Sequence, residues 1–243
     1  INCEWLQDGS QFFWTSERDG WNHIYRYDKN GKLLNQVTTG EFVVRDIVKV
    51  DEENRLIYFI AGGKEPGVDP YYRHLYVVDF SGDEPELLTP ENADHQVWLP
   101  HENGYFVDSY SRVDLPTEHV VRSLSDGKII ARIATANIDD LLETGWKYPE
   151  PFKVKARDGK TDIYGLMYVP SDFDPSKKYP VIDATYSGPQ AVRTPKNFAG
   201  GYSNYDRSIA ELGFAVITID GLGSAWRSKA FHDVSYQNLG DIG

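Results

Sequence analysis

The sequence predicts a chain of two parts, in which β-propeller blades precede the opening of an α/β domain. A strand pattern that recurs before residue 136 predicts the blades. Two continuous apolar runs after residue 180, with a helix-like segment between them, predict parallel strands buried on both faces. We therefore expect a propeller part at 1–136, a linker with a helix and an entry strand at 137–149, and an incomplete α/β domain at 150–243.

The composition is typical of a folded protein in an aqueous surrounding. Of the 243 residues, 40% are apolar and 14% are aromatic, which allows a sizeable core and favours strands. The net charge of −12 argues against nucleic acid as a partner, because proteins that bind nucleic acid carry basic patches. Cys3 is the only cysteine, so no internal disulfide is expected. No apolar stretch approaches the roughly 18 residues that a membrane helix needs.

The blade pattern contains a strand that begins with histidine. The segment HIYRYD at 23–28 recurs as HLYVVD at 74–79 and, more weakly, as HVVRSL at 119–124, so the copies start 51 and 45 residues apart. A further apolar strand precedes each copy: QFFWT at 11–15, LIYFI at 56–60 and GYFVD at 104–108. The segments DKNG at 28–31 and SDG at 125–127 predict turns, because Asn, Asp and Gly tolerate left-handed backbone conformations.

The spacing of the repeats is the main argument for blades. A period of about 40–50 residues with several short strands per unit is typical of a propeller. The three units lie at roughly 10–50, 51–95 and 96–136. Because each blade buries its faces against its neighbours, a propeller needs at least about four blades. We therefore expect these three blades to be part of a larger propeller.

The recurring histidines His23, His74 and His119 are expected to make hydrogen bonds between blades rather than to bind a metal. A metal site needs several ligands, and no carboxylate or second histidine recurs at ligand spacing. Asp28 and Asp79 end their strands, where aspartate is typical of turns. The sequence therefore predicts no metal site.

The second part begins with a helix and a hairpin. Residues 136–145 predict a short connecting helix that Gly145 ends. Asp-Gly at 158–159 predicts the turn of a hairpin whose strands lie at 150–157 and 161–169. This hairpin is the expected entry to the α/β domain.

Two buried strands should follow. The run VIDATY at 181–186 predicts a buried strand that leaves Tyr186 at its carboxyl end, before a Ser-Gly-Pro turn. A helix is expected at 203–212 and a second buried strand at 214–220, and this order predicts a parallel crossover. Ligands of open α/β sheets bind at the carboxyl ends of strands, which makes Tyr186 the candidate site residue.

Serine-hydrolase chemistry needs a nucleophile, a base and an orienting acid. An α/β domain with this chemistry carries the serine in Gly-x-Ser-x-Gly, and the chain lacks that motif. Neither Ser187 nor Ser224 has both flanking glycines. His232 and Asp233 are neighbours in the chain that are not expected to face each other, so we interpret them as structural. The nucleophile, the acid and the base are therefore not expected within these 243 residues.

The glycines after the second buried strand do not form a nucleotide site. The segment Gly221-Leu222-Gly223 resembles the start of a dinucleotide fingerprint, but Trp226 stands where the third glycine belongs. We therefore expect no cofactor.

Several stretches resemble the dipeptidyl peptidase IV family of serine peptidases. In the propeller part these are WTSERDGWNHIYRYD at 14–28 and LLTP at 87–90. In the second part, YSGP at 186–189, DGLGS at 220–224 and the block at 227–240 are similar to the same family. The resemblance implies an eight-bladed propeller, about three blades of which are present, followed by an incomplete α/β-hydrolase domain.

The resemblance also implies a function. Tyr186 would be a catalytic residue whose hydroxyl donates a hydrogen bond to the oxyanion. The whole enzyme would remove N-terminal di- or tripeptides after Pro or Ala by acyl-enzyme hydrolysis, and this segment alone would be inactive. Its partner would be a peptide with Pro or Ala near the N-terminus. By the same resemblance the full-length protein would form a homodimer and would be periplasmic, or extracellular or membrane-associated.

Two alternatives remain at this point. One is a propeller that serves as a binding scaffold and carries a non-catalytic appendage. The other is a different propeller-capped α/β-hydrolase, such as an oligopeptidase or an acylaminoacyl peptidase. The SERDGW segment at 16–21 favours the dipeptidyl peptidase IV family over the second alternative.

Overall fold

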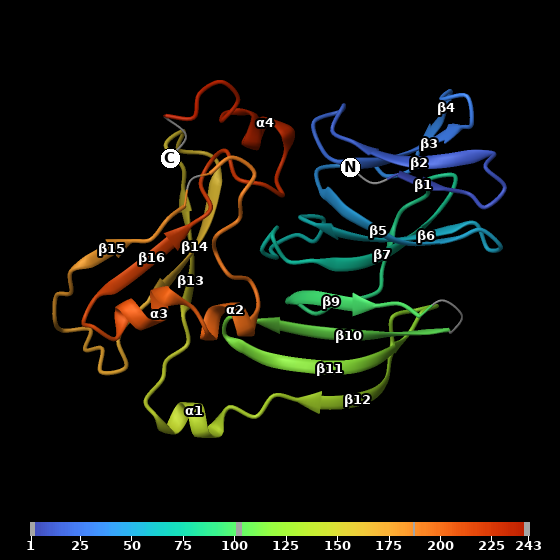
Figure 1. Cartoon of the computed structure of the whole chain (residues 1–243). Coiled ribbons are helices and arrows are strands. Elements are labelled where there is room, and N and C mark those ends of the chain that lie inside the picture. The colour runs from blue at the N-terminus through green and yellow to red at the C-terminus, as the bar shows by residue number, and fades with distance from the viewer. Residues whose placement is uncertain (1–2, 101–103, 187, 241–243) are drawn as a thin grey trace. The chain divides into compact units, whose positions relative to one another are not determined.

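The structure is a computed structural model that describes residues 3–100, 104–186 and 188–240. Within these ranges, sixteen strands form four sheets of four strands each, and four short helices follow the twelfth strand (Figure 1). The chain divides into two compact units. The first comprises residues 1–109, 120–132 and 226–230, and the second comprises residues 110–119, 133–225 and 231–243.

The first sheet has the strand order β1-β2-β3-β4. Its strands are β1 (Cys3–Trp5), β2 (Gln11–Ser16), β3 (His23–Asp28) and β4 (Leu33–Gln36). The predicted turn after β3 forms, because the Asp28 carboxylate accepts hydrogen bonds from the backbone N–H groups of Asn30 and Lys32, both at 2.9 Å. Gly31 supplies the left-handed conformation with φ of 81°.

The second sheet has the order β5-β6-β7-β8. It packs against the first sheet on one face and against a third sheet, described below, on the other. Its strands are β5 (Val43–Asp51), β6 (Leu56–Gly62), β7 (His74–Asp79) and β8 (Glu86–Leu87). Successive side chains of β6 point to opposite faces. Ile57 and Phe59 pack in one apolar core with Phe13 of the first sheet. Tyr58 and Ile60 pack in another core with Phe106.

The third sheet has the order β12-β11-β10-β9. Its strands are β9 (Asp94–Trp98), β10 (Tyr105–Arg112), β11 (Leu115–Ser123) and β12 (Ile129–Thr135). Phe106 of β10 supplies its side of the core shared with the second sheet. Three four-stranded sheets that bury both faces of the middle sheet are consistent with the predicted propeller blades.

The borders of the predicted repeat units differ from the sheets by one strand. The unit predicted at 10–50 ends with the residues of β5, but β5 pairs with β6 and opens the second sheet. The first sheet instead starts with β1, which precedes the predicted unit. A repeat fixes its period but not its starting point, so the choice of border was arbitrary and was wrong here.

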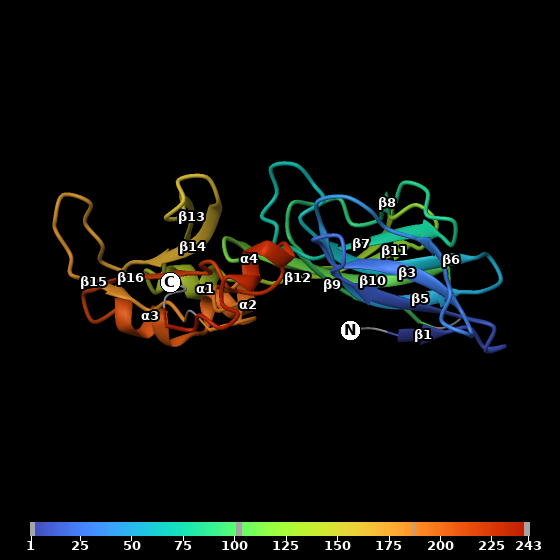
Figure 2. The same cartoon turned by 90° about the horizontal axis from the view of Figure 1, so that it is seen from above.

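The fourth sheet has the order β13-β14-β16-β15 (Figures 1 and 2). Its strands are β13 (Glu150–Lys155), β14 (Asp162–Tyr168), β15 (Val181–Asp183) and β16 (Ala215–Ile219). The predicted hairpin of β13 and β14 is confirmed, with φ of 69° at Gly159 in its turn. The parallel pairing of the two apolar runs is also confirmed, with Ile182 of β15 opposite Val216 of β16.

The helices are short. They are α1 (Asp139–Glu143), α2 (Phe198–Tyr202), α3 (Tyr205–Ala210) and α4 (Lys229–Asp233). The predicted connecting helix is limited to α1, and the helix predicted at 203–212 is limited to α3. Asn204 caps α3 by accepting a hydrogen bond from the backbone N–H of Arg207 at 3.0 Å. None of the helices among the described residues is long and apolar enough to cross a membrane.

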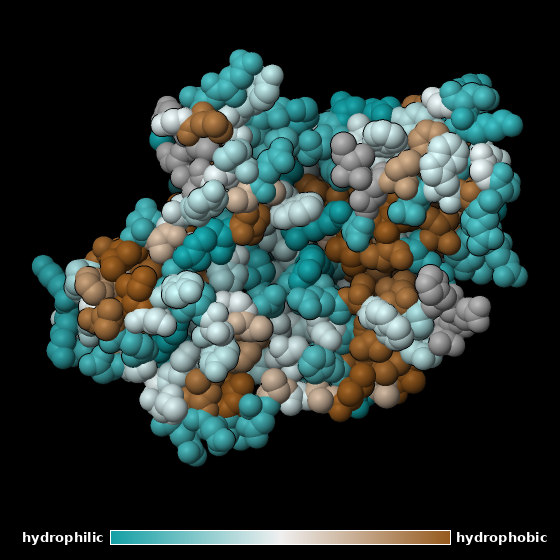
Figure 3. Space-filling view, viewed as in Figure 1, coloured by the Kyte–Doolittle hydropathy of each residue, from teal (hydrophilic) through white to brown (hydrophobic). Residues whose placement is uncertain are grey.

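The strand that ends near Tyr186 differs from its prediction. We expected a buried strand at 181–186, but β15 is three residues long and lies at the edge of its sheet, where Val181 is 63% exposed. Apolar side chains reach the surface at this part of the sheet (Figure 3). Its neighbour β16 has the expected burial, because Val216 packs in one core with Leu166 and Tyr168 of β14. Apolar composition thus predicted the strand but not its edge position.

Candidate functional site

Tyr186 lies just beyond the carboxyl end of β15, beside the carboxyl end of β16. The ladder between the two strands continues past β15, since the Ala184 N–H donates to the Ile217 carbonyl at 2.8 Å. The Ile219 N–H then donates to the Thr185 hydroxyl at 3.3 Å. The side chain of Tyr186 is 61% exposed, and its hydroxyl makes no hydrogen bond to the described residues. This hydroxyl is therefore available as a donor to a ligand.

The Tyr186 ring lies against the backbone of Gly188. A Cβ added to Gly188 would stand 2.3 Å from Cε1 of Tyr186, closer than such atoms approach, and 3.1 Å from the hydroxyl oxygen. Ser187, which we did not interpret as a nucleophile, lies outside the described residues. Ser224 is 4% exposed and donates its hydroxyl hydrogen to the Gly221 carbonyl at 2.8 Å, so it is a turn residue.

Asp220 directly follows β16 and is 1% exposed. One of its carboxylate oxygens accepts hydrogen bonds from the backbone N–H groups of Arg193 at 2.7 Å and Thr194 at 3.2 Å. Burial raises the pKa of this carboxyl, while the two N–H groups and the charge of Lys196 oppose the rise. Asp220 lies at the end of the buried strand expected at 214–220, and no role was predicted for it.

His232 and Asp233 face each other, contrary to the expectation for neighbours in a chain. His232 Nδ1 lies 3.3 Å from a carboxylate oxygen of Asp233, at the end of α4. Both residues line an open cavity of about 570 Å³, together with Pro189, Gln190 and Tyr236. Ser235 also lines this cavity, and its hydroxyl donates to the His232 carbonyl at 2.7 Å, as in a turn.

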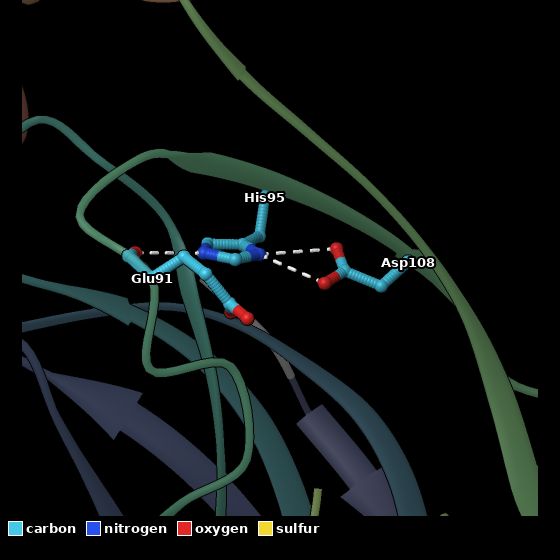
Figure 4. Close-up of side chains that lie close together, drawn as sticks. All are labelled: Glu91, His95 and Asp108. Carbon is cyan, nitrogen blue, oxygen red and sulfur yellow. Dashed lines mark hydrogen bonds and ion pairs between the residues drawn. The ribbon is translucent and has the colours of Figure 1, made fainter. Parts of the chain in front are cut away.

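A second group of charged side chains lies inside the propeller part and was not predicted. His95 of β9 is buried between the backbone carbonyl of Glu91 and the carboxylate of Asp108 from β10 (Figure 4). Its Nε2 is 3.0 Å from the Glu91 carbonyl, and its Nδ1 is 3.0 and 3.1 Å from the two Asp108 oxygens. Both partners are acceptors, so both bonds form only when each ring nitrogen carries a hydrogen.

Arg122 of β11 completes this group. Its guanidinium donates from Nε to Asp108 at 2.8 Å, from Nη2 to the Glu91 carboxylate at 2.6 Å and from Nη1 to the Gly127 carbonyl at 3.0 Å. The side chain of Arg122 is 2% exposed, and those of His95 and Asp108 are fully buried. Two carboxylates thus face the guanidinium of Arg122 and the imidazole of His95. Glu91, His95, Asp108 and Arg122 are called the blade cluster below.

The blade cluster does not suit a metal or catalysis. Ligand atoms of Glu91, His95 and Asp108 lie within 4.8 Å of one another, which would suit a cation by distance alone. The Arg122 guanidinium already binds both carboxylates, however, and a cation would be placed beside that positive charge. His95 and Asp108 are also unsuited to act as a catalytic pair, because His95 Nε2 is already hydrogen-bonded to the Glu91 carbonyl. The blade cluster is therefore a structural ion network.

His23 and His74 bond to the segments that follow the last strands of their sheets, and not to a strand of a neighbouring blade as predicted. His23 contacts the Thr38 hydroxyl at 3.0 Å and the Gly40 carbonyl at 2.9 Å, both just past β4. His74 Nδ1 donates to the Thr89 carbonyl at 2.7 Å, just past β8. In each blade the imidazole fixes the segment that leaves the last strand. His119 lies within β11 and is not equivalent, since it does not begin its strand.

The fold is thus a set of propeller blades followed by a mixed sheet with a parallel strand pair, and comparison with known proteins agrees with this class. Residues 2–117 match the family described as the dipeptidyl peptidase IV N-terminal region. The chain is 30% identical over 235 residues to dipeptidyl peptidase 4 of Trichophyton rubrum and of Trichophyton equinum. Each alignment covers 93% of this chain and 29% of the relative.

Two solved structures resemble the chain over almost its full length. Dipeptidyl peptidase 4 of Porphyromonas gingivalis shares the fold with a TM-score of 0.81 at 23% identity, covering 99% of this chain and 33% of that protein. A Bacteroides ovatus protein assigned as dipeptidyl aminopeptidase IV also gives a TM-score of 0.81, at 26% identity, covering 98% of this chain and 36% of that protein. The chain is homologous to dipeptidyl peptidase 4 and spans less than a third of the length of the curated relatives it matches.

Proposed function

We propose that this chain is the part of a serine exopeptidase of the dipeptidyl peptidase IV type that joins the propeller to the catalytic domain. In this proposal the sheet β13-β14-β16-β15 opens an α/β-hydrolase domain, with its parallel pair β15 and β16 presenting loops at their carboxyl ends. The nucleophile, the acid and the base come from residues outside these 243. Tyr186 supplies one donor of the oxyanion hole.

The observation that supports this proposal most strongly is the free hydroxyl of Tyr186. It is exposed at the carboxyl edge of the parallel pair and donates to none of the described residues. In acyl transfer, the substrate carbonyl oxygen gains negative charge in the transition state, and donors aimed at that oxygen lower the barrier. The tyrosine hydroxyl is an uncharged hydrogen-bond donor on a rigid ring. It can therefore stabilise the negative charge of the oxyanion without adding a charge of its own to the site.

The proposed reaction is removal of N-terminal di- or tripeptides after Pro or Ala. The test uses the full-length protein that contains these residues, with Gly-Pro and Ala-Pro para-nitroanilides as substrates. Turnover that a serine-reactive phosphonate abolishes supports the proposal. Failure of the full-length protein to cleave these substrates contradicts it, and would favour the binding-scaffold alternative.

The 243-residue chain provides a control for the same assay. Because Gly-x-Ser-x-Gly is absent from it, this chain should not turn over either substrate. Turnover by the isolated chain that is sensitive to the phosphonate would mean that a serine within it acts as the nucleophile. Homodimer formation and a periplasmic, extracellular or membrane-associated location are part of the same proposal, and rest on the family resemblance.

A further inference from the structure

We propose that Asp220 is a positioning residue for Tyr186, which it holds in place through the loop at 188–194. This inference rests on the proposed function, since it concerns the tyrosine to which that function assigns the oxyanion. Asp220 would not touch the substrate itself. It would fix the backbone that follows Tyr186 to the end of the neighbouring strand β16.

The first observation is the bonding of the Asp220 carboxylate. It takes two consecutive backbone N–H groups, those of Arg193 and Thr194, on a single oxygen. These donors lie 27 and 26 positions away in the chain, so the contact joins the loop after β15 to the end of β16. A carboxylate that accepts from backbone N–H groups makes stronger bonds than a neutral acceptor, which suits it to hold a loop.

The same two loops are joined a second time through their backbones. The Gln190 N–H donates to the Gly223 carbonyl at 3.1 Å, and the Ala225 N–H donates to the Ala191 carbonyl at 3.3 Å. The side chain of Arg193 adds a third anchor, from its Nη2 to the buried carboxylate of Asp206 at 2.6 Å. The loop after Tyr186 is thus fixed at successive points, and Asp220 holds its last two residues.

The second observation is that Asp220 is buried at a cost. Its other carboxylate oxygen is buried and has no hydrogen-bond partner among the described residues. Burial raises the pKa of the group, because the charged form loses contact with water. An apolar residue would avoid that cost at the end of a buried strand. A side-chain acceptor at this position is explained by the loop whose N–H groups it binds.

Tyr186 depends on this loop for its position. Its hydroxyl has no partner among the described residues, and its ring rests on the backbone of Gly188, two residues before Gln190. The backbone of 188–194 therefore sets where the ring lies. An oxyanion donor must be in place before the charge develops, and an error of about 1 Å can cost about a hundredfold in rate.

The test is a double-mutant cycle in the full-length protein, with kcat and KM measured for the Gly-Pro para-nitroanilide. Asp220→Ala should lower kcat by about 10–100-fold, because Tyr186 is misplaced. KM should change little, because Asp220 does not touch the substrate. Asp220→Asn should restore most of the activity, since the carboxamide oxygen can accept the same two N–H groups. If Asp220 acts through Tyr186, the double variant with Tyr186→Phe should be no slower than Tyr186→Phe alone.

A matched control is available in the same sheet. Asp158 also accepts two consecutive backbone N–H groups on one oxygen, from Lys160 and Thr161 at 2.8 Å each, but in the hairpin between β13 and β14. Asp158→Ala should therefore leave kcat unchanged. Effects of Asp220→Ala and Tyr186→Phe that multiply, or an Asp220→Ala variant with full kcat, would overturn the proposal. Asp220→Ser serves in place of the alanine variant if that variant does not fold.

Hydrogen exchange in the full-length protein separates this proposal from the proposed function. In hydrogen exchange, the amides of Arg193 and Thr194 should be protected in the parent and in Asp220→Asn, and should exchange at least about tenfold faster in Asp220→Ala. Equal protection in all three chains would overturn the role of Asp220 whatever the activity. If protection is lost as expected but Tyr186→Phe keeps full kcat, the result supports Asp220 as the residue that holds the loop and contradicts the oxyanion role of Tyr186.

Discussion

His95 Nδ1 and a carboxylate oxygen of Asp108 lie 3.0 Å apart, and neither side chain reaches solvent. The two residues come from adjacent strands β9 and β10, and Arg122 of β11 binds the same carboxylate. A buried carboxylate is tolerated only when cations and donors surround it. The blade cluster therefore connects three strands of one sheet, and its loss should destabilise the whole sheet.

Arg122→Met should destabilise the protein by about 3–5 kcal/mol, because it leaves the Asp108 carboxylate and its neighbour Glu91 without their main counter-ion. Urea unfolding followed by tryptophan fluorescence measures the change. Lys128→Met is the matched control, since Lys128 pairs with Asp126 on the surface with 82% and 41% of the two side chains exposed. The control should leave the unfolding midpoint almost unchanged. An equal midpoint for both variants would show that the blade cluster contributes nothing.

Stability should fall with acid through His74. Burial lowers the pKa of His74 below 6.5, and the nearby His95 lowers it further. The unfolded chain then binds a proton more readily than the folded one, so this contribution is complete above pH 6.5 and is lost as the pH falls toward the folded pKa. His74→Gln should reduce the slope of Tm against pH between about pH 7 and 5.

His23 provides an independent check on the same effect. Burial is also the largest cause that lowers its pKa, so His23→Gln should flatten the profile in the same direction. The combined variant should have the smallest slope of the four proteins. Profiles that are parallel for the parent and both single variants would contradict the assignment of neutral, buried imidazoles to these positions.

Gly127 should be intolerant of any side chain. Its φ is 68°, and a Cβ there would lie 2.2 Å from the carbonyl oxygen of Leu88. Gly9 has nearly the same φ, 66°, but open space where its Cβ would be. Gly9→Ala should cost about 1–2 kcal/mol of stability from the left-handed backbone alone. Gly127→Ala should cost about 1–3 kcal/mol more, because the backbone at Leu88 must move away from the new Cβ. Equal losses in urea unfolding would show that the close approach to Leu88 is easily relieved.

Much of the fold could be predicted because its signals are local. The strand that begins at His23 and the turn at Asp28 follow from alternating apolar residues and from residues that favour turns. The hairpin around Gly159 and the parallel pair of β15 and β16 were predicted in the same way. The border between the first two blades was not, because the pairing of β5 with β6 is a property of two strands rather than of either one.

The blade cluster and the role of Asp220 could not be predicted, for a physical reason. Arg122 meets Glu91 across 31 positions, and Asp220 meets Arg193 across 27. Each contact depends on the register between strands or on the course of a loop. Neither the register nor the course of a loop can be deduced from a single sequence. Tyr186 could be proposed because the expected strand placed it near a carboxyl end and because the YSGP segment at 186–189 resembles the dipeptidyl peptidase IV family. Its exposed hydroxyl and its dependence on the loop at 188–194 required the structure.

The most direct test of the central claim is kcat for Tyr186→Phe in the full-length protein, with the Gly-Pro para-nitroanilide as substrate. The substitution removes one hydroxyl and keeps the ring that rests on Gly188. Loss of an oxyanion donor should lower kcat by about 10²–10³-fold. Tyr205→Phe, which removes a hydroxyl from an 85% exposed side chain of the same unit, should keep the parent rate. Equal rates for the parent and both variants would contradict the assignment of Tyr186 to the oxyanion.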